Sequence, residues 1–187
     1  MGNFQKGKYR SSTTRLNGWD YRQNAVYFVT ICSYQKEHFF GKIIAGNKSK
    51  HDPDFIDTAA QNFAPLREYL QPTEIGKIAY QYWLKIPEKY PFVSLGEFVI
   101  MPNHVHGLLS FKRKERLEWQ PNQFGPQSQS LGAVIRGYKA GVKSYATKNE
   151  IPFAWQRKFY DHIVRDQKAY HQISEYIQLN PIRWKQA

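Results

Sequence analysis

Two histidines one residue apart, His104 and His106, are the first residues whose types and spacing could do chemistry. They lie in the stretch EFVIMPNHVHGLLSF, residues 97–111, whose pattern predicts a strand, a turn at Pro102 and Asn103, and a second strand. Side chains alternate faces along a strand, so both imidazoles should project the same way. Together they could hold one divalent metal. A zinc ion would need a third protein ligand, whereas magnesium or manganese would need oxygen ligands as well.

The last predicted helix offers the rest of such a site. Tyr176 and Asn180 are four residues apart and therefore share one helical face. Candidates for a third ligand are Asn180, Asp161, Glu175 and Gln178. A metal ion can polarise a phosphodiester, and a tyrosine hydroxyl can attack phosphorus and keep the bond energy as a phosphotyrosine ester. Because the ordinary pKa of tyrosine is about 10, the hydroxyl would need a nearby base, positive charge or metal.

Other tyrosines compete for this role, and an ordinary packing role is the alternative for Tyr176 itself. Tyr138 and Tyr145 lie on the preceding predicted helix, and Tyr170 shares the apolar stripe of the last one. Tyr160 lies on a predicted strand with His162 on the same face, so His162 could support the site, contact phosphate or be structural.

The charge of the chain indicates its partner. Its 27 Lys and Arg residues exceed its 15 Asp and Glu residues, giving a formal charge of +12, and 16% of its residues are aromatic. This combination favours nucleic acid, with aromatic rings available to stack on unpaired bases. A solvated surface is the alternative for each basic cluster. The candidate DNA-binding residues are Arg10, Arg15, Arg136, Lys139, Lys143, Trp155, Arg157 and His162.

Other features exclude some classes of protein. The single cysteine, Cys32, excludes an intramolecular disulfide and a multi-cysteine zinc site. No apolar run reaches the roughly 20 residues of a membrane span, and the N-terminal stretch lacks the apolar core of a signal peptide. We therefore expect a cytoplasmic protein without membrane contact. The length of 187 residues predicts one catalytic domain, 1–187, with a basic arm at 1–19 and polar connections at 45–65 and 112–129.

The elements that must position these residues follow from hydrophobic periodicity and capping signals. The pattern predicts a strand at 25–34 with a partner strand at 38–44, a short strand at 66–70, and the strand pair around His104. Helices are predicted from Thr73 to near Ile86, from Ser130, and from Asp166 to about Asn180, with a further strand at 159–165. The expected fold is α+β: a ferredoxin-like two-layer sandwich with a mainly antiparallel sheet and a C-terminal helix that carries Tyr176.

Several of these stretches resemble a known family. MPNHVHGLL, around His104 and His106, looks like the HUH motif of single-strand nucleases. YIQLNP, residues 176–181, with WQRKFYDHIVRD upstream, resembles the C-terminal signature of the REP-associated tyrosine transposases and their insertion-sequence relatives. RLNGWDY and AVYFVTI match the N-terminal pattern of that group. The similarity spans about 15–184, apart from the two connections. HUH alone is weak, but the combination is specific.

The resemblance implies a metal-dependent transposase that cuts and rejoins single-stranded, hairpin-bearing DNA. By the family pattern, His104 and His106 hold a divalent ion, Mg²⁺ or Mn²⁺, and Asn180 completes its site. Tyr176 is the nucleophile, leaving a 5′-phosphotyrosine and a free 3′-OH. Insertion-sequence members often carry Gln where this chain has Asn180, which is one methylene shorter.

Assembly and activity leave alternatives open. Resemblance to insertion-sequence relatives implies a site assembled across a dimer, and resemblance to the REP-associated branch is compatible with a monomer, so a monomer or a homodimer is expected. The 11 residues after Tyr176 favour a site within one chain. The alternatives to a transposase are a non-catalytic module that binds single-stranded nucleic acid, and a metallonuclease that uses water instead of Tyr176.

Overall fold

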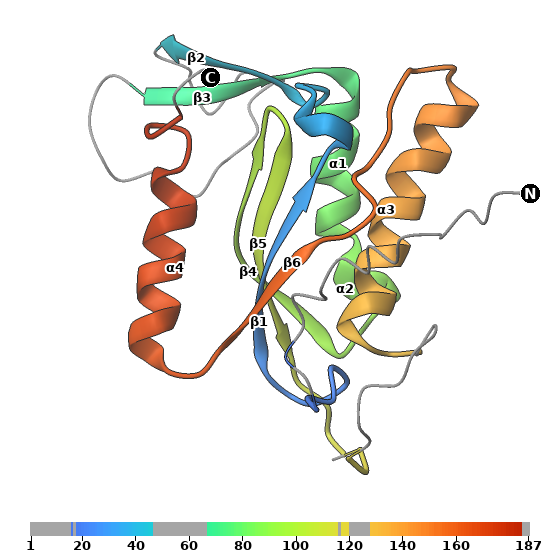
Figure 1. Cartoon of the computed structure of the whole chain (residues 1–187), viewed down its shortest axis with the longest axis vertical. Helices are drawn as coiled ribbons and strands as arrows, with labels where there is room; N and C mark the ends of the chain where they lie inside the picture. Colours follow the sequence, from blue (N-terminus) through green and yellow to red (C-terminus); the bar gives the residue numbers. More distant parts are fainter. Residues whose placement is uncertain (1–15, 17, 47–66, 116, 120–127, 185–187) are drawn as a thin grey trace, which may run out of the picture.

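A four-stranded antiparallel sheet forms the centre of the molecule, with its strands in the order β4-β5-β1-β6 (Figure 1). The computed structural model describes residues 16, 18–46, 67–115, 117–119 and 128–184. The strands are β1 (Val26–Cys32), β4 (Val93–Met101), β5 (His104–Phe111) and β6 (Tyr160–Val164). This arrangement confirms the predicted α+β fold with a mainly antiparallel sheet.

One face of the sheet is covered by α1 (Glu74–Leu84), the short α2 (Ile86–Lys89) and α3 (Leu131–Lys148) (Figure 1). Alternate residues of β1, which are Tyr27, Val29 and Ile31, are fully buried against these helices. Both long helices begin where their capping residues predict. Thr73 accepts a hydrogen bond from the backbone N–H of Gly76, and Ser130 accepts one from Ala133.

The opposite face is covered by α4 (Gln167–Leu179) (Figure 1). Its buried Ile177 packs with Val99, Met101 and Leu108 of the sheet. The side chain of Asp166 caps the helix by accepting a hydrogen bond of 2.8 Å from the backbone N–H of Ala169. The predicted two layers are thus the sheet with α1 and α3, and α4 forms a further layer on the other side.

The strand predicted at 38–44 does not pair with β1. It appears as β2 (Gly41–Gly46) and pairs with β3 (Arg67–Pro72) in a separate two-stranded sheet beside the C-terminal end of α4 (Figure 1). The predicted partnership is wrong because β1 is a central strand, with β5 on one side and β6 on the other. Between β1 and β2 the chain instead makes a single 3₁₀ turn, η1 (Tyr34–Lys36).

The helix that starts after Thr73 ends earlier than predicted. α1 stops at Leu84, and α2 starts at Ile86 with Pro87 in its first turn. A proline lacks the N–H that would continue the α1 hydrogen bonds but is tolerated at the start of a new helix, so α1 ends and α2 begins here.

No helix in the described part of the chain is long and apolar enough to span a bilayer.

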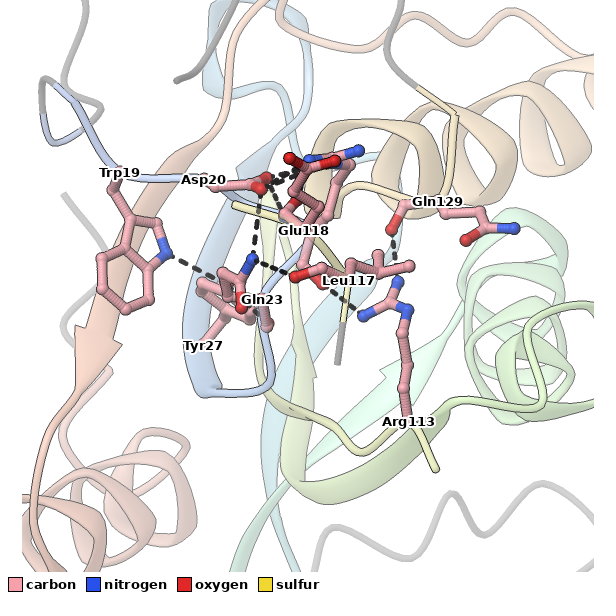
Figure 2. Close-up of polar contacts among 9 residues, drawn as sticks. Trp19, Asp20, Gln23, Tyr27, Arg113, Leu117, Glu118 and Gln129 are labelled. Carbon is pink, nitrogen blue, oxygen red and sulfur yellow. Dashed lines mark hydrogen bonds and ion pairs between the residues drawn. The ribbon is translucent and has the colours of Figure 1, made fainter. Parts of the chain in front are cut away.

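A polar network ties the segment after β5 to the loop before β1 (Figure 2). Asp20 is buried and binds the Arg22 guanidinium through both carboxylate oxygens, the shortest contact being 2.7 Å. The guanidinium of Arg113 donates to the backbone carbonyls of Arg22 and Gln129. These contacts anchor both described ends of the predicted 112–129 connection. The rest of that connection, most of 45–65 and nearly all of the predicted 1–19 arm lie outside the described residues.

Candidate active site

The register of β5 puts both histidines on the face of the sheet that α4 covers. His106 lies opposite Thr30 of β1, and His104 lies opposite Cys32. Their ring centroids are 4.4 Å apart. The prediction that both imidazoles project from the same face of the sheet is therefore confirmed.

His106 is almost fully buried, with 6% of its surface exposed. Its Nδ1 lies 2.9 Å from Oγ1 of Thr30, and its Nε2 lies 3.3 Å from the hydroxyl oxygen of Tyr176. The ring stacks on Phe28 of β1 at a centroid distance of 5.4 Å, and Phe28 also contacts the Tyr176 ring edge to face. Both nitrogens and one face of His106 thus have defined partners.

His104 is held in a similar way. Its Nδ1 donates to the Oδ1 atom of Asn103 at 2.7 Å. The side chain of Asn180 lies beside the imidazole and lines the same cleft, and Trp184 packs next to it with ring centroids 5.9 Å apart. The Asn103 contact fixes the proton on Nδ1, which leaves the lone pair on Nε2.

Both imidazoles are held in the neutral form. Burial lowers the pKa of His104 to about 4, with a smaller contribution from the positive charge of Lys36. Burial, with a smaller contribution from the neighbouring His104, lowers the pKa of His106 to about 3. A metal ligand must be unprotonated, so both histidines are in the state that metal binding needs.

The residues around the histidines fit a divalent cation. In metal sites the second ring nitrogen of a histidine commonly bonds to an oxygen that orients the ring, and Asn103 and Thr30 provide these oxygens. Within the described residues there is no cluster of three His, Cys, Asp or Glu side chains. The amide oxygen of Asn180 is therefore the protein group that would join the two imidazoles. Two imidazoles without a further Cys, His, Asp or Glu fall short of the usual donors of a structural zinc site, whereas an amide oxygen and water would suit Mg²⁺ or Mn²⁺.

The other proposed third ligands lie elsewhere. Asp161 pairs with Val29 across the β1–β6 ladder and so faces the α1 and α3 side of the sheet. Glu175 and Gln178 do not line the cleft that contains the histidines. Asn180 does line this cleft and is 9% exposed.

The amphipathic pattern of α4 brings Tyr176 to the histidines. Ile173 and Ile177 face the sheet and pack on its apolar side chains, which leaves Tyr176 on the rim of the same stripe. The tyrosine is 41% exposed although its hydroxyl contacts His106. α4 ends at Leu179, and Asn180 follows as its C-terminal capping position. A tyrosine in this position is accessible to a large substrate.

The two candidate tyrosines on α3 point away from the site. Tyr138 is buried on the opposite side of the sheet, and its hydroxyl donates to the carbonyl of Ala79 at 3.1 Å. The Tyr145 hydroxyl donates to the Glu74 carboxylate at 2.7 Å. Both serve the contact between α1 and α3.

The remaining candidates share the face of the histidines but do not reach them. Tyr160 lies opposite Thr30, and its ring contacts Phe28 at a centroid distance of 6.5 Å. Tyr170 packs on the apolar side of α4. His162 is exposed on β6, outside the cleft. Of the five candidate tyrosines, Tyr176 alone has a hydroxyl within hydrogen-bond distance of a site histidine.

The candidate DNA-binding side chains of Lys139, Lys143 and Trp155 donate hydrogen bonds to backbone carbonyls of the protein. The ammonium of Lys139 donates to the carbonyls of Gln156 and Arg157, and that of Lys143 donates to the carbonyl of Phe153. Trp155 donates from its indole to the carbonyl of Lys139 and packs against Phe40 and Phe153. These contacts join α3 to the segment before β6.

The other candidates differ in their position. Arg136, Arg157 and His162 are exposed, whereas Arg10 and Arg15 lie outside the described residues. Contact with DNA stays a prediction for all eight candidates.

The site opens into a cleft of about 610 Å³. Its lining combines the two histidines, Tyr176 and Asn180 with Thr30, Cys32, Lys36, His38, Asn103, Arg183 and Trp184. None of these residues is acidic, so the cleft is suited to a negatively charged ligand.

Besides Cys32 on β1, six of the lining residues were not predicted from the sequence: Thr30, Lys36, His38, Asn103, Arg183 and Trp184. A usable signal existed for two of them. Asn103 directly precedes His104, and Thr30 lies in a strand predicted at the centre of the sheet. The others depend on turns whose conformation the pattern does not specify.

Sheet, helix and site define an α+β protein with a histidine pair on a central strand and a tyrosine from a C-terminal helix beside it. No known family profile matches the chain. A protein of Haemophilus influenzae (strain ATCC 51907 / DSM 11121 / KW20 / Rd), described as uncharacterized, is 38% identical over 193 residues, covering 98% of this chain and 94% of that protein. The chain therefore belongs to the same family as this protein.

Two further proteins show which known family the chain resembles. Another protein of the same Haemophilus strain, provisionally assigned as a REP-associated tyrosine transposase, is 27% identical over 101 residues, which are 51% of this chain and 53% of that protein. The solved structure of a REP-associated tyrosine transposase bound to a REP hairpin superposes with a TM-score of 0.52 at 15% identity, covering 92% of this chain and 73% of the other. The chain thus resembles REP-associated tyrosine transposases in sequence and in fold, as the motifs predicted.

Proposed function

We propose that the chain is a metal-dependent transposase that cuts and rejoins single-stranded DNA through a covalent bond to Tyr176. The single observation that carries the proposal is the 3.3 Å contact between the Tyr176 hydroxyl and Nε2 of His106. It brings a candidate nucleophile to a pair of neutral imidazoles. The resemblance to REP-associated tyrosine transposases supports the same reading.

In this proposal the Tyr176 oxygen forms a bond to phosphorus while the bond from phosphorus to the 3′-oxygen breaks. The tyrosine loses its hydroxyl proton, the leaving 3′-oxygen gains one, and the DNA keeps a 5′-phosphate linked to the enzyme. Rejoining reverses these bonds without an external energy source. A divalent ion held by His104, His106 and Asn180 would supply charge stabilisation at the reacting phosphate. Phe28 keeps the His106 and Tyr176 rings in position.

The proposed substrate is single-stranded DNA that carries a hairpin. The solved transposase with the same fold is bound to a REP hairpin, and none of the described residues that line the cleft of this chain is acidic. The exposure of Tyr176 would let an unpaired strand reach its hydroxyl.

The test uses a labelled pool of single-stranded oligonucleotides, each with a hairpin of randomised stem sequence, and Mg²⁺ or Mn²⁺. We expect a labelled adduct that survives denaturing electrophoresis with the wild-type chain. Tyr176→Phe should form no adduct but still bind the pool, because it loses only the attacking oxygen. Tyr160→Phe is the matched control and should form the adduct normally.

Any one of the following results would contradict the proposal. An adduct with Tyr176→Phe would show that Tyr176 is not the nucleophile. An undiminished reaction in a chelator, or with His104→Ala or His106→Ala, would show that the bound metal is not needed for the reaction. Salt-sensitive binding without a cut strand in either metal would favour the non-catalytic binding module. Cleavage without an adduct that persists in Tyr176→Phe would favour a hydrolytic metallonuclease.

A further inference from the structure

The turn that follows β1 has an unfavourable backbone conformation. Gln35 has φ 50° and ψ 20°, and Lys36 has φ 58°. Residues with a Cβ rarely adopt this left-handed region, and two in succession cost free energy that the surrounding structure must offset. Neither residue is the glycine that such a turn would favour.

The contacts around Ser33 hold this turn in place. Ser33 is fully buried, and its hydroxyl lies 2.7 Å from the carbonyl of Glu37 and 2.9 Å from that of Asn103. Its backbone N–H donates to the same Asn103 carbonyl, and the N–H of Tyr34 donates to Ala154. The strained turn is therefore fixed to the Pro102–Asn103 turn, from which the histidine strand starts.

The result of this arrangement is the position of Lys36. Its side chain lines the cleft with the histidines and Tyr176. Among the described residues its ammonium group has no hydrogen-bond or ion-pair partner, unlike the ammonium groups of Lys139 and Lys143, which bind backbone carbonyls.

A second cation lies on the cleft lining. Arg183, in the turn after α4, also lines the cleft and is exposed. Trp184 follows it and packs between His38 and His104, with ring centroids 5.7 and 5.9 Å away. The described lining of the cleft thus combines cationic side chains with an aromatic ring and contains no acidic residue, which is a combination that binds single-stranded nucleic acid.

We propose that the strained turn at 33–37 holds Lys36 as a phosphate-binding residue, which contacts a backbone phosphate of single-stranded DNA beside Tyr176. This inference rests on the proposed function for its substrate, because it assumes that the anion in the cleft is DNA. A lysine ammonium suits the task because it is a compact charge with three donors and can follow a phosphate oxygen. The backbone strain persists because the hydrogen bonds of Ser33 fix the turn in this conformation.

The test measures the binding of labelled oligothymidylate in a chelator, so that no strand is cut, over a series of salt concentrations. One lost phosphate contact lowers the slope of log affinity against log salt by about 0.7 for single strands. We expect this loss for Lys36→Gln and a nearly wild-type slope for Lys36→Arg. Lys148→Gln, which removes an exposed charge from the last turn of α3 on the opposite side of the sheet, should keep the wild-type slope.

Lys36→Gly separates a contact with DNA from a structural role. Glycine adopts a positive φ without strain, so this variant should melt no lower than the wild type and still lose the same salt slope. A merely structural lysine would instead lower the melting temperature and leave the slope unchanged. A wild-type slope in Lys36→Gln would overturn the proposal, as would an equal loss in Lys148→Gln.

The adduct assay keeps this inference distinct from the proposed function. If the wild type forms no adduct with the hairpin pool, the transposase proposal fails, while the salt slopes still decide whether Lys36 contacts phosphate. If the wild type forms the adduct and Lys36→Gln forms it at an equal rate with an unchanged slope, the assignment of Lys36 fails alone.

Discussion

Because His104 and His106 are buried, the folded protein loses stability at a pH low enough to protonate these residues in the unfolded chain, which does not hold for most surface histidines. An unfolded chain takes up protons at these residues below pH about 6.5, whereas in the folded protein His104 and His106 resist protonation down to about 4 and 3. The unfolded state therefore binds more protons between these values. Stability contributed by the neutral histidines is complete above pH about 6.5 and is lost as the pH falls toward 4.

This difference predicts a fall in the free energy of unfolding from pH 7.5 to pH 5 in metal-free buffer. Each histidine should contribute up to about 2 kcal/mol of the loss, because one pKa unit corresponds to about 1.4 kcal/mol. Urea unfolding at the two values measures it. The double variant His104→Gln, His106→Gln should show a smaller fall, and an equal fall in both proteins would contradict the buried, neutral assignment.

The spacing of residues in the sequence was enough to predict that Tyr176 and Asn180 share one helical face and that the two histidines share one face of the sheet. These depend on helical and strand periodicity, which the pattern contains. Lys36 and Trp184 could not be predicted, because their positions depend on a left-handed turn and on the turn after α4. The contacts that Lys139 and Trp155 make within the protein could not be predicted either, because the sequence pattern does not specify which residues pack against them.

At the scale of the elements, the histidine strand is supported from behind by a close contact with α1. Gly107 directly follows His106 and faces α1, and a Cβ at this position would overlap the ring of Trp83. Trp83 is fully buried against this strand. The absence of a side chain at Gly107 lets the indole lie against the backbone of β5, which fixes the strand that carries the site.

Gly107→Ala should therefore destabilise the fold by about 1–3 kcal/mol, the usual cost of overpacking a core. Denaturant unfolding of the variant measures the loss. The added methyl meets the six-membered part of the indole, so Trp83→Phe should recover part of the stability when the two changes are combined. Purely additive effects of the two substitutions would show that the contact is not the cause.

Element boundaries and pairings were predictable to different degrees. Caps at Thr73, Ser130 and Asp166 placed the three long helices, because capping is a local property of the sequence. The partner of β2 was not predictable in this way. Strand pairing depends on which edges remain free, and β1 has none because β5 and β6 occupy both.

At the scale of the whole molecule, the formal charge of +12 does not describe one uniform binding surface. Part of it is used within the fold, as by Arg22 on Asp20 and by Arg113 on backbone carbonyls. Composition predicted attraction to a polyanion but could not separate these cations from Lys36 and Arg183, which line the cleft. Only the folded chain distinguishes the two groups.

The molecule also brings the parts of its candidate site together within one chain. β5 supplies the histidines, and α4 of the same chain supplies Tyr176 at 3.3 Å from His106. If the proposed activity holds, two inactive variants should not restore one another. We expect a mixture of Tyr176→Phe and His106→Ala, unfolded and refolded together, to form no more adduct than either protein alone.

A site shared between two chains by exchange of α4 gives a different result. Half of randomly formed dimers would be mixed and each would restore one of its two sites, so the mixture would regain about one quarter of the wild-type adduct. The adduct assay with the hairpin pool measures this yield, and a mixture of wild type and the His106→Ala variant controls for losses in refolding. Recovery near one quarter would contradict a site built within one chain, and recovery at background would show that each chain acts with its own histidines and its own tyrosine.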